Sequence, residues 1–174
     1  MRTFKTLILI VASGVASRAA LAEDLGVRLS VGGGAGARGL AGQFGAAFPA
    51  EATLTIVPLT SISAGLVASD AGIDHAYGEV GLYLVASLGI GVGYGAYEKA
   101  GARESRTTFH LFAGFPIPLV GNLQIDETIA TQRFVYILPY YRPSWGPWPG
   151  TMHELGVMLK FGFPLRPVEY HRAR

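Results

Sequence analysis

The chain contains no cysteine, so no disulfide bond can hold it together. Exported domains with small cores often depend on disulfides, and a lipid-anchored lipoprotein needs a cysteine at its cleavage site. Beyond its first segment, the sequence also has no apolar run of about 18 residues that reads as a spanning helix. No convincing stretch follows the 3.6-residue period of an amphipathic helix. These absences disfavour a lipoprotein and a helical membrane protein, and the fold must be closed in another way.

The first segment has the features of a secretory signal peptide. A start with two basic residues and a short apolar run precede a small-x-small cleavage site, Ala-Leu-Ala, at 20–22. Arg18 interrupts the apolar run well before the roughly 20 residues that a helix needs to cross a bilayer. We therefore expect residues 1–22 to be cleaved and the exported chain to begin at Glu23.

Removal of the leader changes the charge balance of the chain. The whole sequence has 14 Lys and Arg against 12 Asp and Glu, and three of the basic residues lie in 1–22. The remaining 11 basic residues face 12 acidic ones, which gives a formal net charge of −1. A nucleic-acid-binding surface should show a basic patch or stripe, and the sequence contains none. We therefore expect no nucleic-acid partner.

The rest of the chain consists of segments with two-residue alternation, separated by clusters of Gly, Pro, Asp and Asn. This pattern predicts β-strands, at 25–33, 50–58, 61–69, 79–95 (two strands that divide near 86–88), 107–116, 132–141 and 153–163. Eight strands of about ten residues use up the length that remains after the leader. The sequence therefore predicts an all-β fold, a closed antiparallel up-and-down transmembrane β-barrel of eight strands. Long loops are expected on one end, with both termini on the other, at 33–49, 70–76, 99–106 and 142–151.

The most regular alternation lies in the last predicted strand. One face holds Leu155, Val157, Leu159, Phe161 and Phe163, and the other holds Glu154, Gly156, Met158, Lys160 and Gly162. The segment resembles the closing strand of bacterial outer-membrane β-barrels, which alternates in this way and ends in Phe. In that family the Phe is usually the last residue, whereas here residues 164–174 follow it.

The resemblance implies a small barrel of the eight-stranded type in the outer membrane of a Gram-negative-type cell. The barrel would occupy residues 23–163, and residues 164–174 would form a periplasmic tail. Outer-membrane lipid would surround it, and the barrel-assembly machinery would be its partner during insertion. The implied roles are structural support, surface interaction through the loops, or minor passage of small solutes. An eight-stranded barrel is just wide enough for its own side chains, so a general porin is disfavoured.

The less apolar face of the strands distinguishes a membrane barrel from a soluble one. In the fifth strand that face consists of Gly89, Gly91, Gly93 and Gly95. A water-facing row of Gly costs entropy and packs nothing, whereas inside a narrow barrel it leaves room for large side chains. We therefore interpret the apolar face as facing lipid, with Leu82, Leu84, Ile90, Val92, Val157 and Leu159 on the exterior. The alternative is a soluble exported barrel that binds an apolar ligand inside.

Few residues suggest chemistry. The polar residues predicted to face the lumen are Arg28, Glu79, His110, Glu154 and Lys160, and they must pair or hydrate because isolated buried charge is costly. Asp74-His75 followed by Glu79 leaves open an outer-membrane enzyme that acts on lipid or peptide at the outer mouth. However, the sequence shows no Ser/His/Asp set at a family spacing, no metal-ligand cluster and no phosphate loop. We therefore predict no catalytic residue, no metal and no cofactor.

Overall fold

The structure, a computed structural model, describes residues 27–40, 43–56, 60–70, 74–83, 86–99, 102–120, 134–146, 148 and 150–166. The predicted signal peptide and residues 167–174 lie outside this part of the chain. Among the described residues, no helix has the length and apolar character needed to cross a membrane.

The described residues form nine antiparallel strands. Their bounds are β1 (Val27–Leu40), β2 (Gln43–Ile56), β3 (Thr60–Ser69), β4 (Asp74–Tyr83), β5 (Ser87–Lys99), β6 (Ala102–Gly114), β7 (Ile117–Val120), β8 (Phe134–Trp145) and β9 (Met152–Arg166). Neighbours in sequence are neighbours in the sheet from β1 to β6, and β1 also pairs with β9 along its length.

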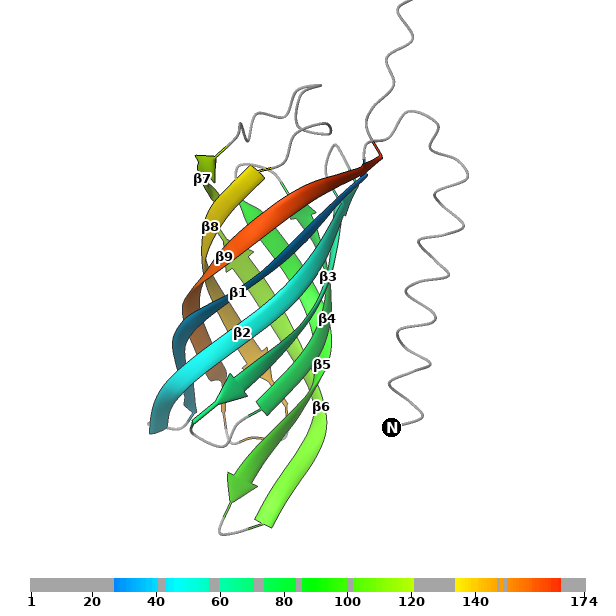
Figure 1. Cartoon of the computed structure of the whole chain (residues 1–174). Coiled ribbons are helices and arrows are strands. Elements are labelled where there is room, and N and C mark those ends of the chain that lie inside the picture. The colour runs from blue at the N-terminus through cyan, green and yellow to red at the C-terminus, as the bar shows by residue number, and fades with distance from the viewer. Residues whose placement is uncertain are drawn as a thin grey trace, which may run out of the picture.

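The sheet closes on itself because β6 also pairs with β8 (Figure 1). The short β7 pairs with the first half of β8, so β6 and β7 together form one wall strand, interrupted at Phe115 and Pro116. Eight wall strands thus make a closed up-and-down barrel, and the predicted fold class is confirmed. Closure pairs the two end regions of the sheet with each other, which explains how the chain holds together without a disulfide.

The two ends of the barrel differ. At the terminal end β1 begins beside the end of β9, where Val27 pairs with Arg166. The other end, called here the hairpin end, carries the connections β1–β2, β3–β4, β5–β6 and β8–β9. In Figure 1 the terminal end is at the top, and the β5–β6 hairpin reaches furthest at the bottom. Both described ends of the chain therefore lie on one side, as predicted.

The four connections predicted for the hairpin end lie there, but the predicted loops are too long, because strands occupy part of each of them. β1 and β2 cover most of 33–49, β4 already begins at Asp74, and β5 and β6 leave only residues 100 and 101 between them. β8 likewise continues to Trp145. The Gly- and Ala-rich part of β1 was predicted as a loop, but it is a strand, and its small residues allow the β9 backbone to approach closely. A Cβ at Gly34 would clash with the carbonyl oxygen of Val157 in β9.

The last strand also extends beyond its predicted end. β9 does not stop at Phe163, since Pro164 pairs with Arg28 and Arg166 pairs with Val27. The register shifts between these two pairs, and an irregularity of this kind is where a strand accommodates proline, which has no N–H. The predicted tail at 164–174 therefore loses its first three residues to the barrel.

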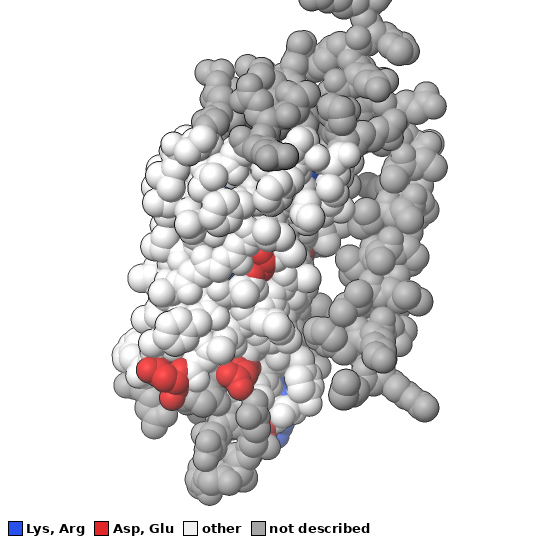
Figure 2. Space-filling view, in the orientation of Figure 1, with Lys and Arg blue, Asp and Glu red and all other residues white. Residues whose placement is uncertain are grey.

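The strands whose faces the sequence could assign have the predicted faces, whereas the faces of β8 had no prediction because both are apolar or aromatic. Among the side chains that the structure describes, four charged ones are not buried, and all four lie toward the hairpin end: Asp70, Asp74, Glu104 and Arg106. Figure 2 shows a wall almost free of charge, with acidic residues gathered mainly near that end. Of the predicted lipid-facing residues, Leu82, Ile90, Val157 and Leu159 are 40–61% exposed. Val92 is partly exposed, and Leu84 lies outside the described residues.

Candidate functional site

The charged residues that are missing from the wall lie inside the barrel. We call Arg38, Glu51, Glu79, Arg142, Glu154 and Lys160 the interior cluster; each of them is at most 7% exposed. Glu51 and Lys160, for example, each lie between two exposed apolar residues of their strands. A strand whose neighbours point to opposite faces places one set in the lumen and the other on the wall.

Arg142 of β8 lies at the centre of the interior cluster. Its Nη2 donates to Glu51 Oε2 at 2.9 Å, and its Nη1 donates to Glu154 Oε1 at 3.0 Å. Its Nε lies 3.7 Å from Glu79 Oε2, and its guanidinium carbon lies 3.9 Å from the centroid of the Tyr77 ring. One fully buried cation therefore links carboxylates from β2, β4 and β9.

Glu154 of β9 holds the part of the cluster nearest to β1. Arg38 donates to Glu154 Oε2 from Nε at 3.0 Å and also from Nη2. The Tyr140 hydroxyl donates to Glu154 Oε1 at 2.8 Å. Glu154 is therefore bonded by two guanidinium groups and one hydroxyl, which compensates the cost of burying its charge.

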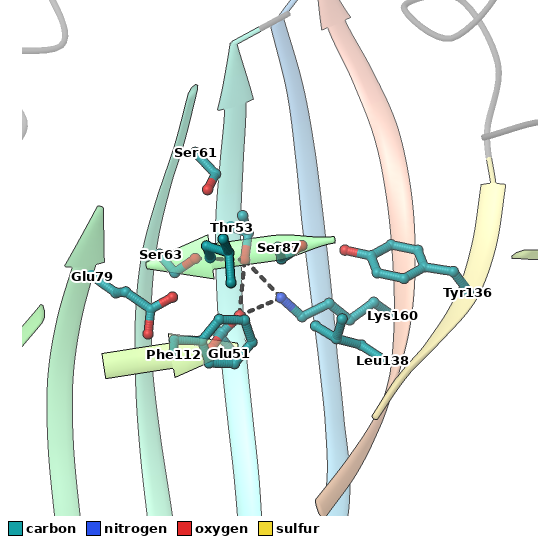
Figure 3. A pocket seen from close by; sticks show the side chains of 11 residues that line it. Glu51, Thr53, Ser61, Ser63, Glu79, Ser87, Phe112, Tyr136, Leu138 and Lys160 are labelled. Atoms are coloured by element: carbon teal, nitrogen blue, oxygen red, sulfur yellow. Dashed lines mark hydrogen bonds and ion pairs between the residues drawn. The ribbon is translucent and has the colours of Figure 1, made fainter. Parts of the chain in front are cut away.

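Glu51 of β2 is satisfied in the same way from the other side of the lumen. Lys160 Nζ donates hydrogen bonds to Glu51 Oε1 and to Thr53 Oγ1, the second at 2.7 Å (Figure 3). Thr53 donates to Glu51 Oε1 at 3.0 Å, and the Tyr77 hydroxyl donates to Oε2 at 2.5 Å. With Arg142, two cations and two hydroxyls surround this carboxylate.

Two histidines connect the cluster to the β4–β6 side of the barrel. His110 Nε2 lies 3.2 Å from Glu79 Oε2, and His75 Nε2 lies 2.8 Å from Thr108 Oγ1. The two imidazole centroids are 5.7 Å apart and their planes are nearly perpendicular. All four side chains are buried.

The rest of the lumen is divided into two unlike halves. An apolar cluster on β6, β8 and β9 consists of Phe112, Phe134, Tyr136, Leu138, Tyr140 and Met158. The opposite side presents the hydroxyls Thr53, Thr55, Ser61 and Ser63 from β2 and β3. Between the halves lies a cavity of about 20 Å³, which Figure 3 shows with its lining residues. A single water needs about 10–15 Å³, so the cavity has room for a water and for no larger solute.

All five residues predicted for the lumen are buried inside the barrel. Glu79, His110, Glu154 and Lys160 belong to one connected network with Arg142. Arg28 lies apart from it near the terminal end, 4.0 Å above the ring of Phe134. Of the residues that suggested an enzyme, His75 and Glu79 point inward, and Asp74 is in β4 at its first residue. Among the described residues there is no group of His, Asp and Glu that could hold a metal ion.

Three central residues escaped prediction from sequence. Arg38 and Arg142 fall in segments that were predicted as loops, and Glu51 lies beside a strand start that was placed seven residues too late. The sequence pattern does hold a clue to Arg142, because Arg142 occupies the same alternate positions of β8 as Tyr136 and Tyr140 and therefore shares their face of the strand. The even positions could not be assigned to the lumen because both faces of this strand are apolar or aromatic.

No family model and no curated protein matches this sequence. Among solved structures, the chain is similar to Neisserial surface protein A, with a TM-score of 0.44 and 11% sequence identity. The alignment covers 80% of this chain and 97% of that chain. The architecture itself rests on the strand order, the closure between β6 and β8, and the charges inside an apolar wall. Together these features are those of a small eight-stranded barrel of the outer-membrane type.

Proposed function

We propose that the chain is an integral outer-membrane protein whose lumen is closed, and that it serves as a structural and surface-interaction element. The observation that carries this proposal is the inverted distribution of polarity. Leu82 and Ile90 are more than half exposed on the wall, while Arg142 and Glu154 are fully buried. In water this arrangement would expose hydrocarbon and bury charge, both at a cost; in a bilayer the same wall contacts lipid.

The interior cluster argues against a role in solute passage. Cations and carboxylates from β1, β2, β4, β8 and β9 are bonded to one another across the lumen. The cavity beside them holds no more than a water. A soluble carrier of an apolar ligand is disfavoured for the same reason, because the interior is charged and filled. The part left to meet partners is the hairpin end, where the charged residues of the surface gather.

The lipid proposal is tested by folding the purified chain without its leader into detergent micelles and into phospholipid vesicles. We expect a heat-modifiable shift in gel mobility in both, and precipitation when the detergent is removed without lipid. A monomer that stays folded and dispersed in buffer alone would contradict a membrane role.

The closed lumen is tested by conductance in planar lipid bilayers. The wild-type barrel should give no stable channel. A variant with Arg142→Ala and Lys160→Ala removes two large side chains from the lumen and should raise the conductance if it folds. Steady wild-type channels that do not change in this variant would show that solutes pass by another route.

A further inference from the structure

The barrel closes through a strand pair with few ladder contacts. Among the described residues, β6 and β8 have four registered pairs, in two groups on either side of Leu111 and Phe112. The carbonyl of Pro139 accepts from Phe115 N–H at 3.0 Å, so the odd positions of β8 direct their backbone groups toward β6 and β7. Pro143 has the same parity and faces Leu111, but it has no N–H to donate. The seam therefore lacks one ladder bond beside Leu111.

An apolar groove of about 720 Å³ crosses the outer wall next to this seam. It follows a registered row across β4, β5, β6 and β8, Leu82, Leu88, Ala113 and Tyr141. A second row, Val80, Ile90 and Leu111, runs beside it, and Pro143 of β8 lines the groove next to Leu111. Ala113 is the smallest of the eight and lies between Leu88 and Tyr141. The floor of the groove is therefore lowest beside the seam.

The seam end of the groove is polar. The Tyr141 hydroxyl and His153 Nδ1 are 2.6 Å apart, and their rings are stacked at 6.0 Å between centroids. Both side chains are exposed on the wall. A tyrosine with an apolar ring and a polar tip suits the boundary between hydrocarbon and headgroups. The groove is thus lined by hydrocarbon and ends at Tyr141, whose hydroxyl pairs with the neighbouring His153, and an apolar body with a polar end is the chemistry of an amphiphile.

The length of the groove matches one acyl chain. From β3, whose Thr60 also lines it, to β8 the groove crosses four inter-strand spacings of about 4.8 Å, or about 19 Å. Because the strands of such barrels are tilted by about 35–45°, this row descends by about 11–13 Å along the bilayer normal, which lies within the roughly 15 Å of half a hydrocarbon core. The direction also fits, since Leu82 is near the terminal end of β4 and Tyr141 is in the half of β8 toward the hairpin end.

We propose that this groove binds one acyl chain of a membrane lipid and that the polar group of the lipid lies against Tyr141 and His153. The proposal rests on the membrane location proposed above, and the groove is continuous with the wall that faces lipid there. A hollow beside the small side chain of Ala113 suits a flexible hydrocarbon chain.

The test is the retention of lipid by the folded full-length chain. Wild type is folded into vesicles of phosphatidylethanolamine and phosphatidylglycerol, extracted into a nonionic detergent and weighed by native mass spectrometry. Ala113→Phe fills the hollow. Ala64→Phe makes the same change on the exposed wall of β3, outside the groove, and is the matched control. We expect one retained phospholipid in wild type and in Ala64→Phe, and none in Ala113→Phe.

A second variant protects the test if Ala113→Phe does not fold. Tyr141→Phe keeps the ring and removes the hydroxyl, and it should reduce the fraction of barrels that carry a lipid. Equal retention in wild type, Ala113→Phe and Tyr141→Phe would overturn the proposal, as would a wild type that carries no lipid. A wild-type dimer that Ala113→Phe dissociates would assign the groove to a second copy instead.

The same samples separate this proposal from the membrane location. Heat-modifiable mobility is recorded for each variant after folding into the vesicles. If all variants fold there and retain lipid equally, the groove proposal fails while the membrane location stands. If wild type does not fold into vesicles at all, the membrane location fails first.

Discussion

Glu51→Gln is the sharpest perturbation of the interior cluster. Glu51 accepts hydrogen bonds from Lys160, Arg142, Tyr77 and Thr53, and Lys160 is 1% exposed. A neutral amide at this position still offers an acceptor oxygen but leaves the buried ammonium without a carboxylate among its described partners. Removing one member of a buried ion pair typically costs about 3–5 kcal/mol. We expect the free energy of unfolding to fall by about this amount.

Removal of the Lys160 charge as well tests whether the unpaired buried ammonium causes the loss of stability. Lys160→Met combined with Glu51→Gln deletes both charges and keeps a long apolar side chain in place of the lysine. Contacting residues of this kind show coupling energies of about 0.5–3 kcal/mol. We therefore expect the double variant to be more stable than Glu51→Gln alone, although it contains one more substitution.

The assay is equilibrium unfolding by urea of the barrel folded in vesicles, followed by gel mobility and by tryptophan fluorescence. Thr55→Val is a control, because Thr55 is an inward, buried residue of the same strand and makes no hydrogen bond to the interior cluster among the described residues. It should change the stability by less than about 1 kcal/mol. A Glu51→Gln variant as stable as wild type, or a double variant less stable than the single one, would refute the reasoning.

Three further outcomes are expected from the wall and the closing strand. Ile90→Arg puts a charge on the lipid-facing wall and should lower the stability in vesicles by about 2–4 kcal/mol if the site is near the midplane; equal unfolding midpoints would place the site outside the hydrocarbon. Gly34→Ala should lower the stability by about 1–3 kcal/mol because the added Cβ meets the β9 backbone. An added Cβ at Gly33 would lie 3.3 Å from the carbonyl oxygen of Pro49, so Gly33→Ala should be tolerated. Similar losses of stability in the two variants would contradict the close approach of β1 and β9 at Gly34. Phe163→Ala should reduce the folded fraction in outer-membrane extracts, whereas deletion of 167–174 should leave it unchanged. The reverse result would show that assembly does not depend on the aromatic end of β9.

The strands could be predicted where their two faces differ in size and polarity. Residues 61–69 and 153–163 alternate between large apolar side chains and small or charged ones, and the structure contains strands there with the expected faces. Prediction failed at 33–49, because a strand of Gly and Ala has no contrast between its faces. The end of the strand at Tyr141 was also predicted wrongly, because Pro143 and the aromatic residues after it are typical of a loop, whereas β8 continues to Trp145.

The predicted inward residues show the same limit. Arg28 and Lys160 could be placed in the lumen from strand parity alone, since a charge on the other face would have met lipid. Their partners could not be inferred, because those depend on the register of every strand between them.

The sequence by itself thus determined the all-β class, the closed barrel and which face of most strands is polar, since these follow from a two-residue period and from the chain length. Only the tertiary structure decided which charges meet. Arg142 bonds to Glu51 across 91 residues of sequence, Lys160 to Glu51 across 109, and Arg38 to Glu154 across 116. Arg38 and Glu154 meet because β1 and β9 pair in this register, and Lys160 and Glu51 meet because both lie opposite Gly32 of β1. Arg142 of β8 reaches Glu79 of β4 only because the sheet curves into a barrel, since four other strands separate β8 from β4 in the strand order.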